Sequence, residues 1–145
     1  MTLRLWLHDK RVLQAVIDTN VVVSAVINPR GTPARVIEEI RTFALIPVVS
    51  PAVLAEYTEV LRRARFGFPS ELVDRLLDDL SALALHIVPN AQIPANLPDP
   101  GDAPFIATAK TAACPIVTGN GRHFPAECGV LILSPAECLA RISAR

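Results

Sequence analysis

Short, almost wholly apolar runs recur along the chain and are separated by segments with helical periodicity. The runs cover residues 12–17, 45–49, 85–88, 116–118 and 129–133. Runs of this kind predict strands that are buried on both faces, because a half-exposed strand would alternate apolar and polar residues. Buried strands that alternate with helices indicate a parallel sheet.

The segments between these strands predict helices over about residues 20–27, 32–43, 51–65, 70–84, 102–113 and from 135 onward. Three of the helices begin with a hydroxyl residue followed by proline, at Thr32, Ser50 and Ser134, a pattern typical of an N-cap and a first helical position. Residues 89–101 hold four prolines and no helical period, which predicts a loop. The order of elements predicts an α/β fold, a three-layer α/β/α sandwich around a mainly parallel sheet.

The length and charge of the chain narrow the function. The 145 residues contain no internal repeat and predict one domain, residues 1–145, with a core over about residues 12–139. Fourteen basic residues balance fourteen acidic ones, so no overall positive field attracts nucleic acid and any such binding must be local. Twelve of the basic residues are arginines. Arginine suits bidentate contacts with phosphate, although a GC-rich genome produces the same bias.

Cysteine usage and hydropathy predict a cytoplasmic protein. The three cysteines, Cys114, Cys128 and Cys138, are odd in number and form no C-x-x-C pair, which argues against a disulfide framework and a zinc site. The apolar residues near the start, 3–7, are too few for a signal peptide core, and no stretch reaches the roughly 18 apolar residues of a membrane span.

The first predicted strand ends abruptly in polar residues. Asp18, Thr19 and Asn20 interrupt an apolar stretch that resumes with three valines. In open α/β sheets, ligands bind just beyond the carboxyl ends of the strands. Asp18 is therefore the first candidate for chemistry, and its structural alternative is a helix N-cap.

Further acids lie near helix borders and helix starts. Glu56 falls at the edge of the apolar face of its predicted helix, whereas Glu59 points toward solvent. Asp99 belongs to an Asp-Pro-Gly turn, and Asp102 is positioned to cap the next helix. A capping aspartate can still turn an oxygen outward, so the structural and functional interpretations of Asp102 coexist.

The fourth strand is followed by Thr118, Gly119 and Asn120, and then by Arg122 and His123. Asn-Gly is a turn signal, so Asn120 is a candidate for a left-handed backbone conformation. His123 could act as a general base, but a solvated or hydrogen-bonded loop histidine is the preferred interpretation. Acids at strand and helix ends, without zinc spacing, favour Mg²⁺ or Mn²⁺. Such an ion lowers the pKa of a bound water and neutralises charge on a phosphodiester.

The order and spacing of these segments resemble the PIN-domain nucleases, in the branch of toxin components of toxin–antitoxin systems related to the VapC-type ribonucleases. The matching segments are VIDTNVVVSAVINPRGTPARVIEEI, VVSPAVLAEYTEVLRRARF, LPDPGDAPFIATAKTA, PIVTGNGRHFP and ILSPAE. The resemblance implies a metal-dependent endoribonuclease that hydrolyses RNA phosphodiester bonds. It also implies a cognate antitoxin that occupies the cleft, and a homodimer.

The resemblance also assigns roles to individual residues. Asp18, Glu56 and Asp102 match the catalytic, metal-binding acids, and Asp99 matches an additional acid of this branch. The supporting polar positions are Thr19, Asn20, Ser24, Thr118 and Asn120. From their place in the sequence, Arg122 is the preferred candidate for RNA contact, and Arg62, Arg63 and Arg65 are candidates whose alternative is a solvated helix end.

One position departs from the family pattern. Many PIN nucleases carry an acid where this chain has Asn120, although the branch often shows the amide. With one carboxylate fewer, we expect one well-held ion and a second that arrives with substrate. The substitution leaves open a catalytically weak or inactive PIN fold that binds RNA or protein. An aspartate-loop phosphatase is disfavoured, because Asn20 stands where that class requires an acid.

Overall fold

Five short parallel strands form the centre of the molecule. The computed structural model describes residues 12–91, 93 and 96–144. All pairings in the sheet are parallel, and the strand order is β3-β2-β1-β4-β5. The strands are β1 (Leu13–Ile17), β2 (Leu45–Val49), β3 (Leu85–His86), β4 (Ile116–Val117) and β5 (Ile132–Leu133).

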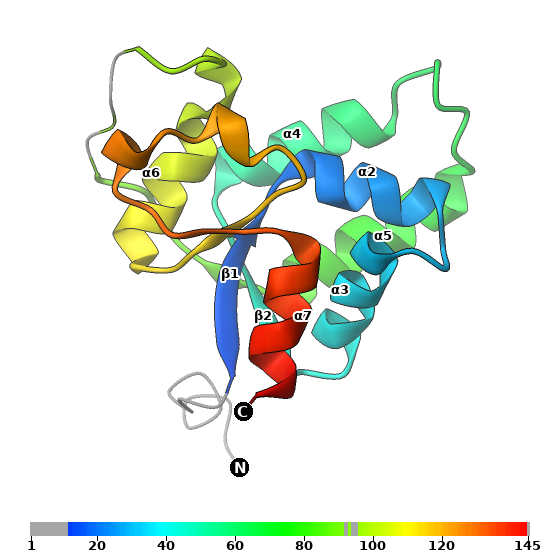
Figure 1. Cartoon of the computed structure of the whole chain (residues 1–145). Coiled ribbons are helices and arrows are strands. Elements are labelled where there is room, and N and C mark those ends of the chain that lie inside the picture. The colour runs from blue at the N-terminus through cyan, green and yellow to red at the C-terminus, as the bar shows by residue number, and fades with distance from the viewer. Residues whose placement is uncertain (1–11, 92, 94–95, 145) are drawn as a thin grey trace.

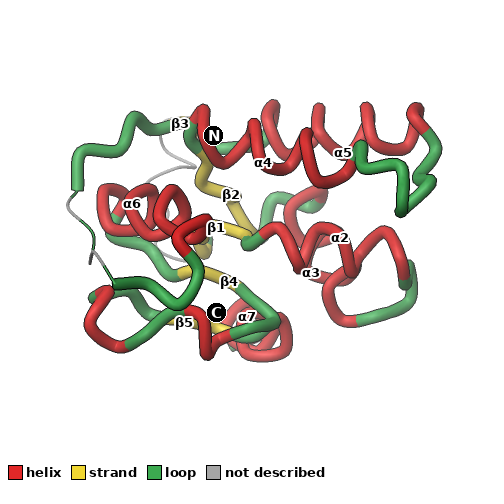
Figure 2. The backbone as a smooth tube through the Cα atoms, turned by 90° about the horizontal axis from the view of Figure 1, so that it is seen from above, coloured by secondary structure: helices red, strands yellow, loops and turns green. Residues whose placement is uncertain are grey.

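Helices cover both faces of this sheet. Helix α6 packs against β1, β2 and β4 on one face, and α3 and α7 lie on the other (Figures 1 and 2). The helices are α2 (Thr19–Ile27), α3 (Thr32–Arg41), α4 (Pro51–Leu61), α5 (Ser70–Ala82), α6 (Ala103–Ala112) and α7 (Pro135–Ser143). This arrangement confirms the predicted α/β fold class.

Burial explains why the strands are so uniformly apolar. Every residue of β2 is buried, and Ala15, Val16 and Ile17 of β1 have no exposed surface. A central strand of a parallel sheet has helices on both faces, so neither face tolerates unpaired polar groups. The cysteines Cys114, Cys128 and Cys138 are free thiols and are buried in this core.

Several predicted boundaries differ from the observed ones. Helix α4 ends at Leu61, its last buried residue, rather than near Arg65. Gly31, not Thr32, caps α3, and no side chain bonds to that helix end. Ser50 and Ser134 cap their helices as predicted.

The segment before α6 begins its helical structure earlier than expected. Residues 100–102 form a 3₁₀ turn, η1 (Pro100–Asp102), and α6 starts at Ala103. Proline fixes the backbone of the first turn, and the Asp99 side chain closes it by accepting a hydrogen bond from the Gly101 N–H. Within the described part of the chain, no helix has the length and apolarity to cross a membrane. The N-terminal apolar residues 3–7 lie outside the described residues.

The strand order determines where a ligand can bind. From β1 the chain continues to β2 and β3 on one side of the sheet, and it then crosses to β4 and β5 on the other side. The direction of winding reverses between β1 and β4, and such a reversal opens a crevice beyond the carboxyl ends of the two strands. Asp18 follows β1 and Thr118 follows β4, so both lie at this crevice.

Candidate active site

Asp18 is held by hydrogen bonds from two directions. Its Oδ1 accepts from the Thr19 N–H at 2.8 Å, and its Oδ2 accepts from the Thr118 hydroxyl at 2.7 Å. Asp18 therefore caps α2 and also contacts Thr118 after β4, so its structural interpretation is confirmed, while its role in chemistry stays a prediction. Burial raises the pKa of Asp18, while these two hydrogen bonds oppose the rise.

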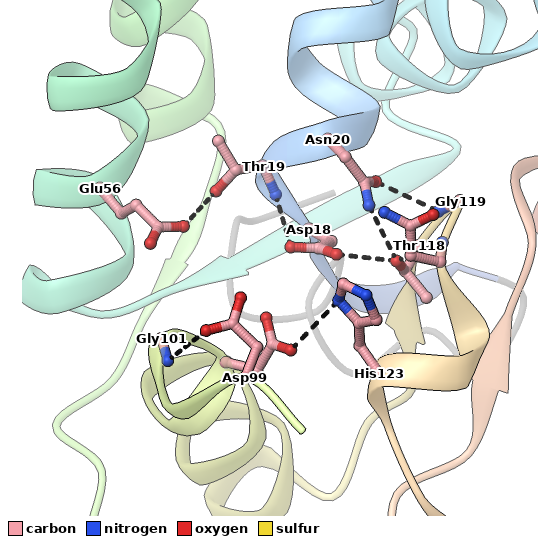
Figure 3. A network of polar contacts seen from close by, with 11 residues as sticks. Asp18, Thr19, Asn20, Glu56, Asp99, Gly101, Thr118, Gly119 and His123 are labelled. Atoms are coloured by element: carbon pink, nitrogen blue, oxygen red, sulfur yellow. Dashed lines mark hydrogen bonds and ion pairs between the residues drawn. The ribbon is translucent and has the colours of Figure 1, made fainter. Parts of the chain in front are cut away.

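Thr118 connects the two strand ends. Its hydroxyl accepts hydrogen bonds from Asn20 Nδ2 at 3.3 Å and from the Asn120 N–H at 3.0 Å (Figure 3). The Asn20 Oδ1 accepts from the Gly119 N–H at 3.1 Å. These bonds fix the start of α2 against the loop after β4. Asn120 has φ of −125° and ψ of 63°, so the expected left-handed conformation is wrong.

Glu56 reaches the same place from α4. It is half-buried, and its Oε2 accepts a hydrogen bond from the Thr19 hydroxyl at 2.5 Å. The next residue, Tyr57, is fully buried and donates its hydroxyl to the carbonyl of Ile17, the last residue of β1. This bond anchors α4 on β1 and so brings Glu56 toward Asp18. Burial, and then the charges of Asp18 and Glu56, raise the pKa of Tyr57.

Asp102 is a buried acid whose environment disfavours its charged form. Its side chain is 10% exposed, and its Oδ2 is buried with no hydrogen-bond partner. Burial first, and then the charges of Asp18 and Asp99, raise the pKa of Asp102 to about 7. A buried acceptor without a hydrogen-bond donor costs free energy. Binding of a cation or of a hydrogen-bond donor at this oxygen would remove that cost.

His123 faces Asp102 from the loop that follows β4. It ends a second 3₁₀ turn, η2 (Gly121–His123), and its Nδ1 is 3.7 Å from the Asp102 Oδ2. One ligand atom each of Asp99, Asp102 and His123 lie within 4.8 Å of one another. The turn η1 thus supplies Asp102, and the turn η2 supplies the imidazole of His123 beside it.

These side chains surround a single open cavity of about 400 Å³. Of the predicted site residues, the cavity is lined by Asp18, Thr19, Asn20, Ser24, Glu56, Arg63, Arg65, Asp99, Asp102 and Asn120. A larger cavity of about 610 Å³ lies between α2, α3 and α5. Of its three acids, Glu38 and Asp79 form salt bridges with Arg41, and Asp78 is exposed to solvent.

The predicted arginines differ in their surroundings. Arg62 pairs with Asp74 at 2.5 Å, and Arg63 forms two hydrogen bonds with Glu59. Arg65 lies over the ring of Phe66, 4.9 Å from its centroid. Arg122 is exposed and does not line the cavity.

The acids fit a divalent cation. Among the described residues, no lysine or arginine forms a salt bridge with Asp18, Glu56, Asp99 or Asp102. Carboxylate oxygens are the preferred ligands of Mg²⁺ and Mn²⁺, and the Asp102 Oδ2, which has no hydrogen-bond partner among the described residues, is an oxygen ligand of this kind.

Comparison with known proteins identifies the family and the fold. The sequence model of the PIN domain matches residues 14–122. The chain belongs to the PIN domain family. The uncharacterized protein MJ1680 of Methanocaldococcus jannaschii is 29% identical over 116 residues, which cover 77% of this PIN domain protein and 74% of the relative. The structure of VapBC-1 from nontypeable Haemophilus influenzae matches with a TM-score of 0.58 at 17% identity, over 86% of this chain and 99% of that one.

The family and its fold are therefore confirmed, and they support the coarser prediction of a nuclease, while the individual site residues stay predictions. The structure gives two further residues a place in the geometry of the site, Tyr57 and His123. Tyr57 looked like an ordinary core residue of the apolar helix face, and a hydroxyl on that face was the available signal. His123 is an exposed turn residue, as predicted, and the structure also places it at the cavity, three residues after Asn120.

The raised pKa of Asp102 predicts how this PIN domain responds to pH when metal is removed. Between the ordinary value of 3.8 and about 7, the folded state binds more protons than the unfolded state. The free energy of unfolding therefore falls as pH rises through this window. Asp102→Asn removes the charge, and we expect it to raise the free energy of unfolding by about 1–2 kcal/mol at about pH 8, after allowance for solvent screening.

Urea unfolding with a chelator present measures this effect. The gain should shrink as the pH approaches about 4. Asp78→Asn is the matched control, because Asp78 is exposed on α5 and lies outside the cavity; it should change the free energy by less than about 0.5 kcal/mol. A loss of stability in Asp102→Asn at about pH 8 would contradict the electrostatic strain.

Proposed function

We propose that this PIN domain protein is a metal-dependent endoribonuclease and the toxin of a type II toxin–antitoxin pair. One observation carries the proposal: acids from three separate segments line one cavity, and the buried Asp102 Oδ2 among them has no hydrogen-bond partner in the described part of the chain. Family membership supports phosphodiester hydrolysis as the use of that cavity.

The residues that would hold Mg²⁺ or Mn²⁺ are Asp18, Glu56 and Asp102, together with Asp99. When bound, the ion would lower the pKa of a water and offset charge on the phosphodiester. Thr118 and Thr19 keep the carboxylates of Asp18 and Glu56 oriented through the hydrogen bonds described above. Such orientation by surrounding donors raises the affinity and the precision of a metal site.

The other polar residues serve substrate and geometry. Asn20 braces Thr118, and Asn120 exposes an amide at the rim of the cavity. Ser24 lines the cavity and is exposed, so its hydroxyl is available to a phosphate oxygen. Because Asn120 adds no charge, the site attracts a second divalent ion less strongly than an all-acid site would.

Arg65 and Arg122 are the proposed RNA contacts, with Arg62 and Arg63 as weaker candidates because acids already engage them. Arg65 lines the cavity beside Phe66, and an arginine on an aromatic ring offers both charge and a stacking surface to single-stranded RNA.

We expect Arg65→Ala to weaken RNA binding by about tenfold and to reduce its salt dependence, because one phosphate contact is lost. Fluorescence anisotropy with a labelled single-stranded RNA at two salt concentrations measures this. Arg35→Ala, on α3 and outside the cavity, is the control. Equal losses in both variants would show a general charge effect and reject the assignment of Arg65.

The proposed protein partner is a cognate antitoxin, and the proposed assembly is a homodimer in the cytoplasm. The solved neighbour is a VapBC-1 structure, which supports a toxin–antitoxin setting. An acidic cavity without an internal lysine or arginine partner also suits a cationic side chain presented by a second protein. Such a side chain would compete with the divalent ion for the same oxygens.

The second candidate function is a PIN fold that binds RNA or protein without cleavage. The neutral Asn120 favours this alternative, because it removes one carboxylate from the rim of the cavity.

The substitution Asp18→Asn separates the two functions. Asparagine preserves the cap of α2, so the fold is retained. We expect Mn²⁺-dependent cleavage of RNA to fall by roughly 100-fold or more, since the site loses a charged ligand. Expression of the unsubstituted chain should arrest growth, and expression of Asp18→Asn should not.

Cleavage is measured on a panel of structured and unstructured RNAs, with Asp78→Asn as the control for a lost surface carboxylate. If the unsubstituted protein binds no Mn²⁺ and cleaves none of these RNAs, the binding module replaces the nuclease. Unchanged cleavage by Asp18→Asn would refute the proposed role of Asp18.

A further inference from the structure

Two short turns bring Asp99, Asp102 and His123 together across the cavity. The turn η1 carries Asp102 and follows Asp99, and η2 ends at His123, some twenty residues further along the chain. Each turn is closed by its own backbone hydrogen bond, from the Asp102 N–H to the Asp99 carbonyl and from the His123 N–H to the Asn120 carbonyl. Phe124, directly after His123, is buried and anchors the second turn in the core.

The Asp102 Oδ2 and the His123 Nδ1 lie close enough together for both to reach one ion. The Asp102 Oδ2 and the His123 Nδ1 are 3.7 Å apart, which is too long for a hydrogen bond. In an octahedral site with ligand distances near 2.1 Å, adjacent ligands lie about 3.0 Å apart and opposite ones about 4.2 Å apart. The observed 3.7 Å, marked by the dashed contact of His123 in Figure 3, is below the upper limit of about 4.2 Å for two ligands of one ion, so both atoms can contact the same cation.

A second, independent observation points to a ligand at this place. The Asp102 side chain is nine-tenths buried, and its Oδ2 has no hydrogen-bond partner. The Asp99 Oδ1 already accepts from the Gly101 N–H, which holds that carboxylate toward the cavity while its second oxygen stays available. The carboxylates thus supply two oxygens, and the exposed imidazole supplies one nitrogen.

We propose that His123 is itself a metal ligand, and that Asp99, Asp102 and His123 form a mixed oxygen and nitrogen position that selects Mn²⁺ over Mg²⁺. This inference rests on the proposed function, because the position lies in the same cavity. Mg²⁺ is a hard ion that favours carboxylate and water oxygens, whereas first-row transition ions also accept imidazole nitrogen. A histidine ligand therefore adds more affinity for Mn²⁺ than for Mg²⁺.

The competing explanation is a charge pair in which protonated His123 only compensates Asp102. A charge pair would weaken when a divalent cation enters the cavity, and it places no nitrogen on the ion. The two explanations therefore differ in a property of the bound metal that does not require enzymatic turnover.

The test compares Mn²⁺ binding by the unsubstituted chain, by His123→Gln and by His86→Gln. Calorimetry gives the dissociation constants of Mn²⁺ and Mg²⁺, and pulsed electron paramagnetic resonance detects ¹⁴N coupled to bound Mn²⁺. His123 is 46% exposed at its side chain, so glutamine at this position does not disturb the core. His86 is exposed on β3, outside the cavity, and bonds to the Ser81 carbonyl, which makes it the matched control.

We expect ¹⁴N coupling in the unsubstituted chain and in His86→Gln, and none in His123→Gln. The dissociation constant of Mn²⁺ should rise by about tenfold or more in His123→Gln, while that of Mg²⁺ changes by less than about threefold. Bound Mn²⁺ without ¹⁴N coupling, or equal Mn²⁺ affinity with and without His123, would overturn this inference and leave the nuclease proposal intact. Failure of the unsubstituted chain to bind Mn²⁺ at all would overturn both.

Discussion

The molecule must hold several carboxylates close together at the carboxyl ends of β1 and β4, where their charges repel one another. Hydrogen bonds from Thr19 and Thr118 fix Asp18, and the buried hydroxyl of Tyr57 fixes α4 to the last carbonyl of β1. These bonds orient the acids without neutralising them. The raised pKa of Asp102 records the remaining repulsion and burial, which a divalent cation would relieve.

Much of this arrangement follows from the sequence because it depends on local signals. Apolar runs specify the buried strands, and serine followed by proline marks the starts of α4 and α7. Asp18 could be singled out because a polar stop has no packing role in a central strand. The contacts among Asp18, Thr118 and Asn20 join residues about one hundred positions apart, and no local pattern shows which hydroxyl will face which carboxylate.

The end of helix α4 and the position of the His123 ring were harder to predict, because both depend on tertiary contacts. Helix α4 stops at Leu61, where burial ends, although the residues that follow favour helix on propensity alone. His123 lies near Asp99 and Asp102 only because the turn η2 meets η1 across the cavity, which is a tertiary contact. Asn120 places a neutral amide, and not a carboxylate, at the wall of the cavity, which limits the negative charge there.

We propose that the buried Asp102 Oδ2 binds a divalent cation in this cavity. Crystals of the protein grown with Mn²⁺ and measured at a wavelength where manganese scatters anomalously test this most directly. We expect an anomalous peak in the cavity, about 2.2 Å from the Asp102 Oδ2. Crystals whose peaks all lie outside the cavity, with this oxygen still without a partner, would contradict it.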